Sequence, residues 1–293
     1  MSTTKHPPKS VSIIIPAKNE QSSLMRILPE IRQNLPDAEI IVVNDGSSDN
    51  TDDACRAHDV RVVTHPYSMG NGAAIKSGTR SATGDILVFM DADGQHNPDD
   101  IPRLISKYSE GYDMVVGARH SSSQASLGRS YANRIYNWLA SWMVGRKIDD
   151  LTSGFRVATA AKFREFIYLL PNGFSYPTTI TMSFFRAGYP IAYLPIHAAN
   201  RQGESHINPL HDGLRFLLII FKIGTLYSPL KIFLPISLTF FTTGLGYYVY
   251  TYVTEHRFTN MSGLLFTTSV LIFLIGLVSE QITNLLYSQT HKD

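Results

Sequence analysis

The sequence has a single cysteine and two long stretches without charge in its C-terminal third. Cys55 excludes an intrachain disulfide and a cysteine-based zinc site. Asp, Glu, Lys and Arg are absent from Ile232 to Thr254 and again from Phe258 to Ser279. About 20 residues at a rise of 1.5 Å cross a hydrocarbon core, so each stretch is long enough for a membrane-spanning helix. Two buried helices of a soluble core would need surrounding protein, and only a short segment follows the second stretch.

The N-terminal segment MSTTKHPPKS lacks the apolar core of a signal peptide, which predicts that the region before the spans stays in the cytosol. Two spans return the C-terminus to the same side. Arg215, Lys222 and Lys231 precede the first stretch and Lys292 follows the second, whereas Arg257 alone lies between them. This bias follows the positive-inside rule, and it predicts a two-span membrane protein with a cytoplasmic N-terminal domain.

The first two hundred residues alternate predicted strands with predicted helices. Residues 20–35 have apolar side chains at helical spacing, with Pro29 expected to kink or divide the helix. Further helices are expected near Thr51 and after the turn in MGNGAAIKSGTRSA. This alternation predicts an α/β fold with a parallel sheet. The predicted strands are Ser10–Ile15, Glu39–Val43, Val60–Thr64, Asp85–Met90, Asp113–Gly117 and Ile191–Ile196.

Three polar strings, PAKNE, NDGSSD and DADGQ, directly follow the ends of predicted strands. In parallel α/β sheets, ligands bind at the carboxyl ends of the strands. We therefore expect these strings to meet in one cleft.

Asp91 and Asp93 stand one residue apart in VFMDADGQH. Two carboxylates so close repel each other and resist desolvation unless a cation or a substrate offsets the cost. An ordinary loop is the simplest interpretation, since aspartates are common in turns. A calcium loop is excluded, because it needs glycine at its sixth position and an acid at its twelfth, and these are His96 and Pro102. A phosphatase of the haloacid dehalogenase type fits MDADG, but such enzymes usually carry the string on their first strand, and three predicted strands precede it here.

The remaining interpretation is a metal that holds a diphosphate. Mg²⁺ or Mn²⁺ commonly binds through one or two carboxylates plus substrate phosphates. A nucleotide-sugar donor carries a diphosphate, and its departure develops negative charge that a metal stabilises. Gln95 is close enough in sequence to add a third oxygen, and Asp45, Asn19 and Glu20 beside the rigid Pro16 suit a nucleoside.

Taken together, these strings resemble family 2 glycosyltransferases of the GT-A fold, and among them the polyprenyl-phosphate sugar synthases related to dolichyl-phosphate mannose synthase. The resemblance covers about residues 10–207. It implies a Rossmann-like, mostly parallel sheet in the catalytic domain, followed by a two-helix transmembrane hairpin. The matching strings are IIIPAKNE, VVNDGSSDNT, MGNGAAIKSG, MDADGQHNP, GAR ending at Arg119, DDLTSGFR and RQGESH.

The resemblance also implies roles for individual residues. The implied catalytic residues are Asp91, Asp93 and Asp150, and the implied metal ligands are Asp91, Asp93 and Gln95. The implied contacts to the nucleotide-sugar are Pro16, Ala17, Asn19, Glu20, Asp45, Gly72, Asp91, Ala92 and Asp93. The implied phosphate-binding residues, for the acceptor or the donor, are Arg119, Arg129, Arg201 and Ser205. His206 departs from the pattern, because relatives commonly have lysine there.

The expected organisation is an N-terminal tail (1–9), a GT-A domain (10–207), an amphipathic interfacial segment (208–229) and a transmembrane hairpin (230–288). In the interfacial segment His211, Arg215 and Lys222 share one stripe of an apolar helix, which suits a helix lying in a membrane surface. The expected partners are a UDP- or GDP-linked sugar, a polyprenyl phosphate such as dolichyl or undecaprenyl phosphate, and the membrane. No nucleic acid is expected, and a homo-oligomer stays open.

The chemistry of the acceptor and two features of the sequence favour a lipid phosphate over a saccharide. A phosphate monoester is largely dianionic at pH 7 and needs no strong general base, whereas a sugar hydroxyl needs a positioned carboxylate, for which Asp150 is the candidate. The Gln-x-x-Arg-Trp string of processive polysaccharide synthases is absent, and a cationic segment expected at the membrane surface lies between the catalytic domain and the hairpin. Arginine-rich surroundings suit phosphate better than a neutral sugar. Three alternatives remain: an enzyme that extends a lipid-linked saccharide, the phosphatase, and a non-catalytic membrane scaffold.

Trp138 and Trp142 are four residues apart in the predicted helix YANRIYNWLASWM. Tryptophans at this spacing are typical of core packing or of membrane-surface anchors rather than of sugar platforms.

Overall fold

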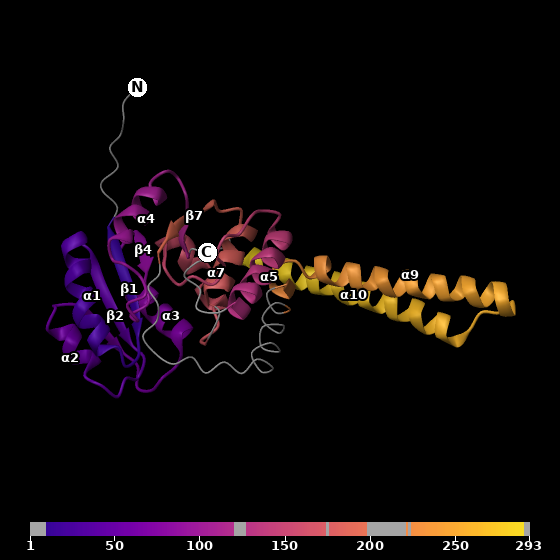
Figure 1. Cartoon of the computed structure of the whole chain (residues 1–293), viewed down its shortest axis with the longest axis horizontal. Helices are drawn as coiled ribbons and strands as arrows, with labels where there is room; N and C mark the ends of the chain where they lie inside the picture. Colours follow the sequence, from indigo (N-terminus) through magenta and orange to yellow (C-terminus); the bar gives the residue numbers. More distant parts are fainter. Residues whose placement is uncertain (1–9, 120–126, 174–175, 198–220, 222–223, 290–293) are drawn as a thin grey trace, which may run out of the picture. The chain divides into compact units, whose positions relative to one another are not determined.

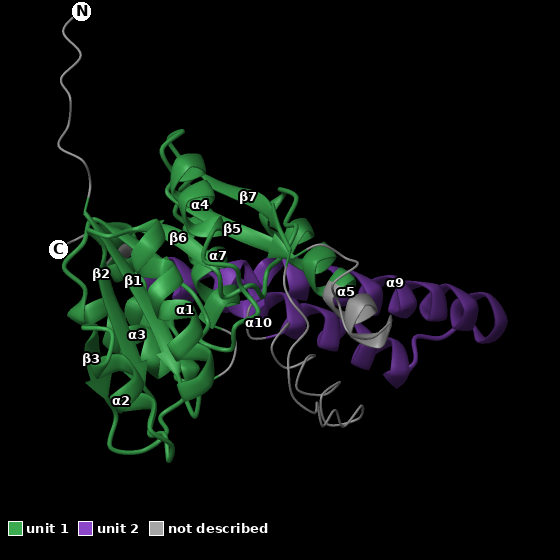
Figure 2. Cartoon of the chain, turned by 60° about the vertical axis from the view of Figure 1, so that its left-hand side comes forward, with its two compact units in different colours: residues 1–206 green, residues 207–293 purple. Residues whose placement is uncertain are grey.

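The computed structural model describes residues 10–119, 127–173, 176–197, 221 and 224–289, with the backbone alone in 127–133 and 288–289. The chain divides into two compact units, residues 1–206 and 207–293 (Figure 2). Each unit is described by itself.

The first unit is built on a seven-stranded sheet with the order β3-β2-β1-β4-β6-β5-β7 (Figure 1). All neighbouring pairs are parallel except those of β6, which runs antiparallel to β4 and to β5. The sheet is therefore mostly parallel, as predicted. The strands are β1 (Val11–Ala17), β2 (Glu39–Asn44), β3 (Arg61–Thr64), β4 (Ile86–Phe89), β5 (Met114–Arg119), β6 (Arg156–Thr159) and β7 (Ile191–Ile196).

The central strands are buried on both faces, which explains their nearly continuous apolar sequences. Ile13, Ile14 and Ile15 of β1 have no exposed surface, and neither do Leu87 and Val88 of β4. Six of the seven strands lie within two residues of the predicted ranges. The sequence did not predict β6, because it has only four residues and begins with an arginine.

Helices cover the sheet and connect its strands (Figure 1). Of the two outcomes expected at Pro29, a kink or a division, the division is excluded, because α1 continues through Pro29. Pro29 and Met25 lie on the exposed face, so water can satisfy the carbonyl that loses its partner, while Leu28 and Ile31 pack inward. The helices are α1 (Gln21–Asn34), α2 (Thr51–Arg56), α3 (Asn71–Ser81), α4 (Asp100–Tyr108), α5 (Leu127–Val144), α6 (Ala160–Glu165) and α7 (Tyr176–Arg186), with a short 3-10 helix at Ile167–Leu169.

The second unit contains a hairpin of two long helices, α9 (Pro229–Glu255) and α10 (Asn260–Gln289). Both are long and apolar enough to cross a membrane, and only 11% and 17% of their most apolar windows is buried. Helices of a soluble core would be mostly buried, so the exposed apolar surface favours a membrane environment. Between the helices, Ser237 and Ser269 each donate a hydroxyl to the other's carbonyl at 2.9 Å, which satisfies both polar groups inside the apolar pair.

Candidate active site

The loops after β1 and β2 are joined by hydrogen bonds at the carboxyl edge of the sheet. Asn19 donates its amide to Ser47 Oγ at 2.9 Å, and its side-chain oxygen accepts the Ser48 amide at 2.8 Å. Glu20 donates its amide to Thr51 Oγ1 at 3.3 Å. Asn19 has a φ of 57°, a left-handed conformation that asparagine tolerates better than most residues. The strings PAKNE and NDGSSD therefore form one continuous surface.

Asp45, at the end of β2, is buried, and its carboxylate is fully engaged by the chain. Oδ1 accepts hydrogen bonds from His65 Nδ1 and the Met69 amide, each at 2.7 Å. Oδ2 accepts from Ser68 Oγ and the Gly70 amide, each at 2.9 Å. Burial opposes ionisation of Asp45, but these hydrogen bonds outweigh it and hold its pKa below the ordinary value. In this arrangement Asp45 organises the loop after β3, and a nucleoside would have to displace one of these donors to bind the carboxylate.

The remaining predicted nucleotide contacts have mainly packing roles. Gly72 is buried, and a Cβ there would overlap the carbonyl oxygen of Pro171, so the close approach of these backbones explains the glycine. The methyl groups of Ala17 and Ala92 belong to the hydrophobic core. These residues can offer a ligand only their backbone, whereas Pro16 is partly exposed.

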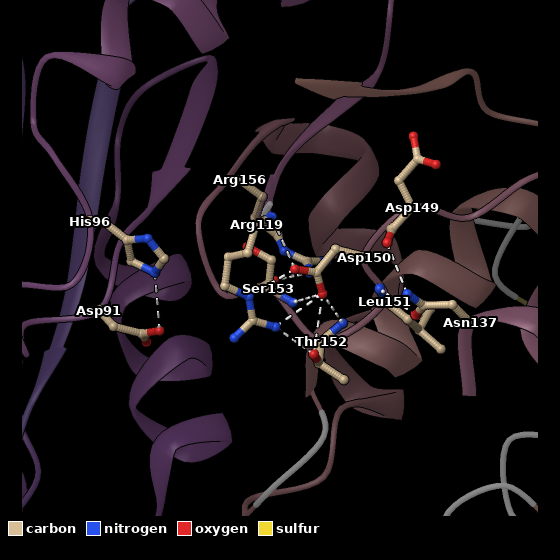
Figure 3. A network of polar contacts seen from close by, with 10 residues as sticks. All are labelled: Asp91, His96, Arg119, Asn137, Asp149, Asp150, Leu151, Thr152, Ser153 and Arg156. Atoms are coloured by element: carbon tan, nitrogen blue, oxygen red, sulfur yellow. Dashed lines mark hydrogen bonds and ion pairs between the residues drawn. The ribbon is translucent and has the colours of Figure 1, made fainter. Parts of the chain in front are cut away.

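Asp91 follows β4, and 33% of its side chain is exposed. Its Oδ2 lies 3.7 Å from Nε2 of His96, which is buried and stacks on Phe155 with ring centroids 4.9 Å apart (Figure 3). Burial raises the pKa of Asp91. The contact with His96 and the charges of Arg119 and Arg156 lower it by more, so the pKa of Asp91 lies below the ordinary value. Asp91 is therefore an ionised carboxylate that a ligand can reach.

Gly154, in the string DLTSGFR, leaves room for this carboxylate. A Cβ at Gly154 would lie 2.6 Å from Asp91 Oδ2, closer than real contacts allow. Any larger residue at this position would push the Asp91 carboxylate aside.

Asp93 and Gln95 form the turn beyond Asp91. The Gln95 amide donates to Asp93 Oδ1 at 3.1 Å, and both side chains are partly exposed. No group of three or more His, Cys, Asp or Glu side chains within the described residues is arranged to hold a metal. Two carboxylates and an amide oxygen fit Mg²⁺ or Mn²⁺ only if the substrate supplies further oxygens, which is the usual arrangement for a metal that binds a diphosphate.

Asp150 lies in a different environment, shown in Figure 3. Arg119 donates Nε to Asp150 Oδ2 at 2.8 Å and Nη2 to Oδ1 at 3.0 Å, a bidentate ion pair. Oδ1 also accepts the backbone amides of Thr152 and Ser153 at 3.0 and 3.1 Å. Burial opposes ionisation, but these contacts dominate and lower the pKa of Asp150.

This geometry argues against Asp150 as a general base. A general base must reach the proton that it removes, and its pKa should lie near the working pH. The Asp150 side chain is only 7% exposed, its oxygens are occupied, and its pKa is lowered. The geometry instead gives Asp150 the role of fixing Arg119 and the loop that carries Gly154.

Arg119 uses two of its three guanidinium nitrogens in contacts within the protein. Its Nε and Nη2 bind Asp150, and Nη2 also donates to Thr152 Oγ1 at 2.6 Å. Nη1 has no hydrogen-bond partner in the described part of the chain, and 26% of the side chain is exposed. Figure 3 shows the Arg119 guanidinium between the carboxylates of Asp91 and Asp150. It is therefore placed to bind an anion beside them.

The other predicted phosphate-binding residues lie outside what the structure describes. Arg201, Ser205 and His206 fall in residues 198–220, and Arg129 belongs to α5 where the backbone alone is described. Most of the predicted interfacial segment 208–229 also falls outside the described residues. Their predicted roles stay predictions.

The structure reveals three residues near the aspartate pair to which the sequence had assigned no role: His96, Gly154 and Arg156. Arg156, on β6, is fully buried and donates Nη1 to the Pro177 carbonyl at 3.1 Å and to Thr181 Oγ1 at 3.0 Å. Both Gly154 and Arg156 belong to DLTSGFR, and His96 directly follows DADGQ. Their positions in these strings were the only available signal, since their contacts come from residues distant in sequence.

Two known protein families match this chain, one in the first unit and one in the hairpin. The family described as glycosyl transferase family 2 matches residues 12–169, and the family described as the GtrB C-terminal hairpin matches residues 228–285. The second match covers the α9 and α10 hairpin.

Crystal structures of glucosyl-3-phosphoglycerate synthase from Mycobacterium tuberculosis are similar in fold. The complex with phosphoglyceric acid is 22% identical over 74% of this chain and 79% of that chain, with a TM-score of 0.59. The complex with Mn²⁺, UDP and glucosyl-3-phosphoglycerate is 22% identical over 74% and 78%, also with a TM-score of 0.59. The complex with Mn²⁺ and UDP-glucose is 21% identical over 74% and 78%, with a TM-score of 0.55. The family match covers more than half of the 293 residues, and the chain therefore belongs to glycosyl transferase family 2.

Proposed function

We propose that this glycosyltransferase moves a sugar from a nucleotide-sugar to a polyprenyl phosphate at a membrane surface, giving a polyprenyl-phosphate sugar with inverted configuration. The observation that carries the proposal is the combination, in one chain, of a family 2 domain with a GtrB-type hairpin of two helices apolar enough to span a membrane. A membrane anchor is useful to such an enzyme when one of its substrates is a lipid. The catalytic domain then lies on the cytoplasmic side, where nucleotide-sugars are made.

The donor site is formed by the loops after β1, β2 and β4. Asp91 and Asp93, with Gln95, would hold Mg²⁺ or Mn²⁺ together with the donor diphosphate. When bound, the metal supplies positive charge that stabilises the departing nucleoside diphosphate. The titles of the similar synthase structures name Mn²⁺, UDP and UDP-glucose, which supports a divalent metal and makes UDP-sugars the first donors to test.

Arg119 binds a phosphate beside the aspartate pair. Asp150 fixes two of its nitrogens, and the remaining Nη1 can donate to a phosphate oxygen. Since Arg119 is already ordered by the fold, little side-chain entropy is lost when the phosphate binds.

The environment of Asp150 supports a phosphate acceptor over a saccharide. A sugar hydroxyl needs a base to take its proton, and Asp150, the carboxylate that the sequence suggested for this role, is occupied by Arg119, Thr152 and Ser153. A lipid phosphate is already largely dianionic at pH 7, so it attacks the anomeric carbon without such a base.

The test is transfer of labelled sugar from a panel of UDP- and GDP-sugars by the purified full-length chain in detergent, with Mn²⁺ or with a chelator. The acceptors are polyprenyl phosphate, a lipid-linked saccharide and phosphoglyceric acid, and the Asp91→Asn variant is the negative control. We expect a metal-dependent, lipid-extractable product from one donor with polyprenyl phosphate. Transfer only to the lipid-linked saccharide, or only to phosphoglyceric acid, would contradict the proposed acceptor.

A further inference from the structure

The carboxylate of Asp45 is bound by four donors of the chain, two on each oxygen. They are His65 Nδ1 and the Met69 amide on Oδ1, and Ser68 Oγ and the Gly70 amide on Oδ2. A carboxylate has about four lone-pair positions, so the fold fills all of them. A ligand that uses Asp45 as an acceptor must therefore replace one of these donors.

The two backbone donors are fixed by the close packing of their loop. A Cβ at Gly46 would lie 2.6 Å from the Ser68 amide nitrogen, so the loop backbone lies directly against the turn between β2 and α2. A Cβ at Gly70 would lie 2.6 Å from the Asn172 carbonyl oxygen, and that carbonyl accepts the Ala73 amide at 2.9 Å. The two amides cannot withdraw from the carboxylate unless this packing is broken.

Of the two side-chain donors, His65 is held from both sides. Its side chain is 7% exposed, Nδ1 lies 2.7 Å from Asp45 Oδ1, and Nε2 lies 2.8 Å from Ser77 Oγ on α3. Ser68 differs, because it is exposed and reaches Asp45 through a hydroxyl that rotation about one side-chain bond moves away. Ser68 Oγ is therefore the donor that a ligand displaces most easily.

The Ser68 hydroxyl also accepts a hydrogen bond from a cation. Lys18, in the loop after β1, donates Nζ to Ser68 Oγ at 3.1 Å, and Ser68 Oγ donates to Asp45 Oδ2 at 2.9 Å. The hydroxyl thus lies between a donor and an acceptor. A nucleobase edge with a ring N–H beside a carbonyl, as in uracil and guanine, offers the same two functions. In cytosine and adenine the ring nitrogen carries no proton, and an amino group replaces the carbonyl.

We propose that Ser68 Oγ occupies the position of a nucleobase edge, and that it turns away when the donor binds. Asp45 Oδ2 then accepts the ring N–H, and Lys18 Nζ donates to the adjacent carbonyl. The inference rests on the proposed function, because it requires a nucleotide-sugar donor, and it names the class of base. Uracil and guanine nucleotides fit this site. A cytosine or adenine nucleotide would present a ring nitrogen without a proton to Asp45 and an amino group to Lys18, so neither side chain would gain a partner.

Ser68 then competes with the nucleotide for Asp45. Its hydrogen bond to Asp45 must break before the base binds, so the hydroxyl lowers the affinity for the nucleotide. A net hydrogen bond of this kind changes an affinity by about 2- to 10-fold. Removal of the hydroxyl should therefore tighten nucleotide binding, whereas loss of an ordinary ligand contact would weaken it.

The test is isothermal titration calorimetry of UDP, GDP, CDP and ADP with the purified full-length chain in detergent with Mn²⁺. Ser68→Ala removes the hydroxyl, Ser68→Thr keeps one, and Lys18→Met removes the cation while keeping a long side chain. Ser109→Ala, at an exposed serine directly after α4, is the matched control. Thermal melting in detergent checks that each variant is folded.

We expect the wild type to bind UDP or GDP at least about 10-fold more tightly than CDP and ADP. Ser68→Ala should bind the preferred nucleotide about 2- to 10-fold more tightly than the wild type does, and Ser68→Thr and Ser109→Ala should match the wild type. Lys18→Met should weaken binding of the preferred nucleotide and leave CDP and ADP unchanged, so that the preference shrinks.

Two results would overturn the inference and leave the proposed sugar transfer intact. One is unchanged or weaker nucleotide binding in folded Ser68→Ala, and the other is binding of CDP by the wild type as tightly as UDP and GDP. If the wild type binds none of the four nucleotides with Mn²⁺, the nucleotide-sugar donor of the proposed function fails together with the inference. The measurement requires no acceptor, so an error in the proposed acceptor does not affect it.

Discussion

Asp91 and Asp150 both lie near the carboxyl edge of the sheet, both have a lowered pKa, and yet their surroundings differ. The Asp91 side chain is 33% exposed, and its Oδ2 lies 3.7 Å from Nε2 of His96. The Asp150 side chain is 7% exposed and binds Arg119 and two backbone amides. Ionisation therefore does not separate a reactive carboxylate from a structural one. The difference lies in whether the fold has already occupied the oxygens.

The largest expected effect is on activity, when Asp91 or Asp93 loses its charge. Asp93→Asn should lower the rate of sugar transfer by at least about 100-fold, because it removes charge that holds a metal and a diphosphate. Its thermal stability should be unchanged or higher, since the substitution relieves repulsion from Asp91. Asp53→Asn, a 67% exposed aspartate on α2, is the matched control and should keep full activity. Loss of activity in Asp93→Asn through unfolding, measured by thermal melting in detergent, would contradict this account.

A smaller loss of activity is expected when Asp91 is displaced rather than removed. In Gly154→Ala the new methyl group would meet Asp91 Oδ2 at 2.6 Å, so the carboxylate must shift. A misplaced group of this kind can cost about 100-fold in rate or less. The KM for Mn²⁺ should rise as well. Gly173→Ala adds a methyl with no atom within 4 Å and should behave as the wild type; equal activity of the two variants would show that the position of Asp91 is unimportant.

Substitution of Asp150 should mainly lower the stability of the protein. Asp150→Asn leaves Arg119 without its anionic partner, and breaking a largely buried ion pair from one side costs about 3 kcal/mol. The free energy of unfolding, measured in detergent, should fall by this order, while the folded fraction keeps more activity than Asp93→Asn does. An Asp150→Asn variant that is fully stable and fully inactive would identify Asp150 as a catalytic base after all.

The smallest effect is a pH dependence of that stability difference. The folded pKa of Asp150 is lowered, so its ionisation contributes stability that is present above the unfolded pKa and is lost as the pH falls through the folded pKa. Thermal melting of the wild type and Asp150→Asn should therefore differ most near neutral pH. The two curves should converge in acid below about pH 4. A difference that stays constant over this range would mean that the Asp150 charge does not contribute to folding.

Much of the fold could be predicted from the sequence, because the apolar strands and their intervening helices have local signals. Ile191–Ile196, for example, was predicted with the bounds of β7. The strand β6 was missed, since its four residues are defined by antiparallel pairing with β4 and β5 and by burial of Arg156. The continuity of α1 through Pro29 depends on which helix face meets water, and this is a tertiary property.

The site could be located from the sequence, but the roles of its residues could not be separated. Asp45, Asp91 and Asp150 all lie in strings typical of the family, and from the sequence each was expected to contact a substrate. Their occupancy depends on donors far along the chain, such as Arg119 for Asp150 and Gly70 for Asp45. Such pairings form only when the sheet brings the strand ends together.

The most direct test of the contrast between Asp91 and Asp150 is to measure, by electron paramagnetic resonance, how much Mn²⁺ the full-length chain binds in the presence of UDP. The account predicts that the wild type and folded Asp150→Asn each bind Mn²⁺ with UDP, and that Asp91→Asn and Asp93→Asn lose it. Undiminished Mn²⁺ binding in Asp93→Asn, or an equal loss in folded Asp150→Asn, would contradict the assignment of the metal to Asp91 and Asp93.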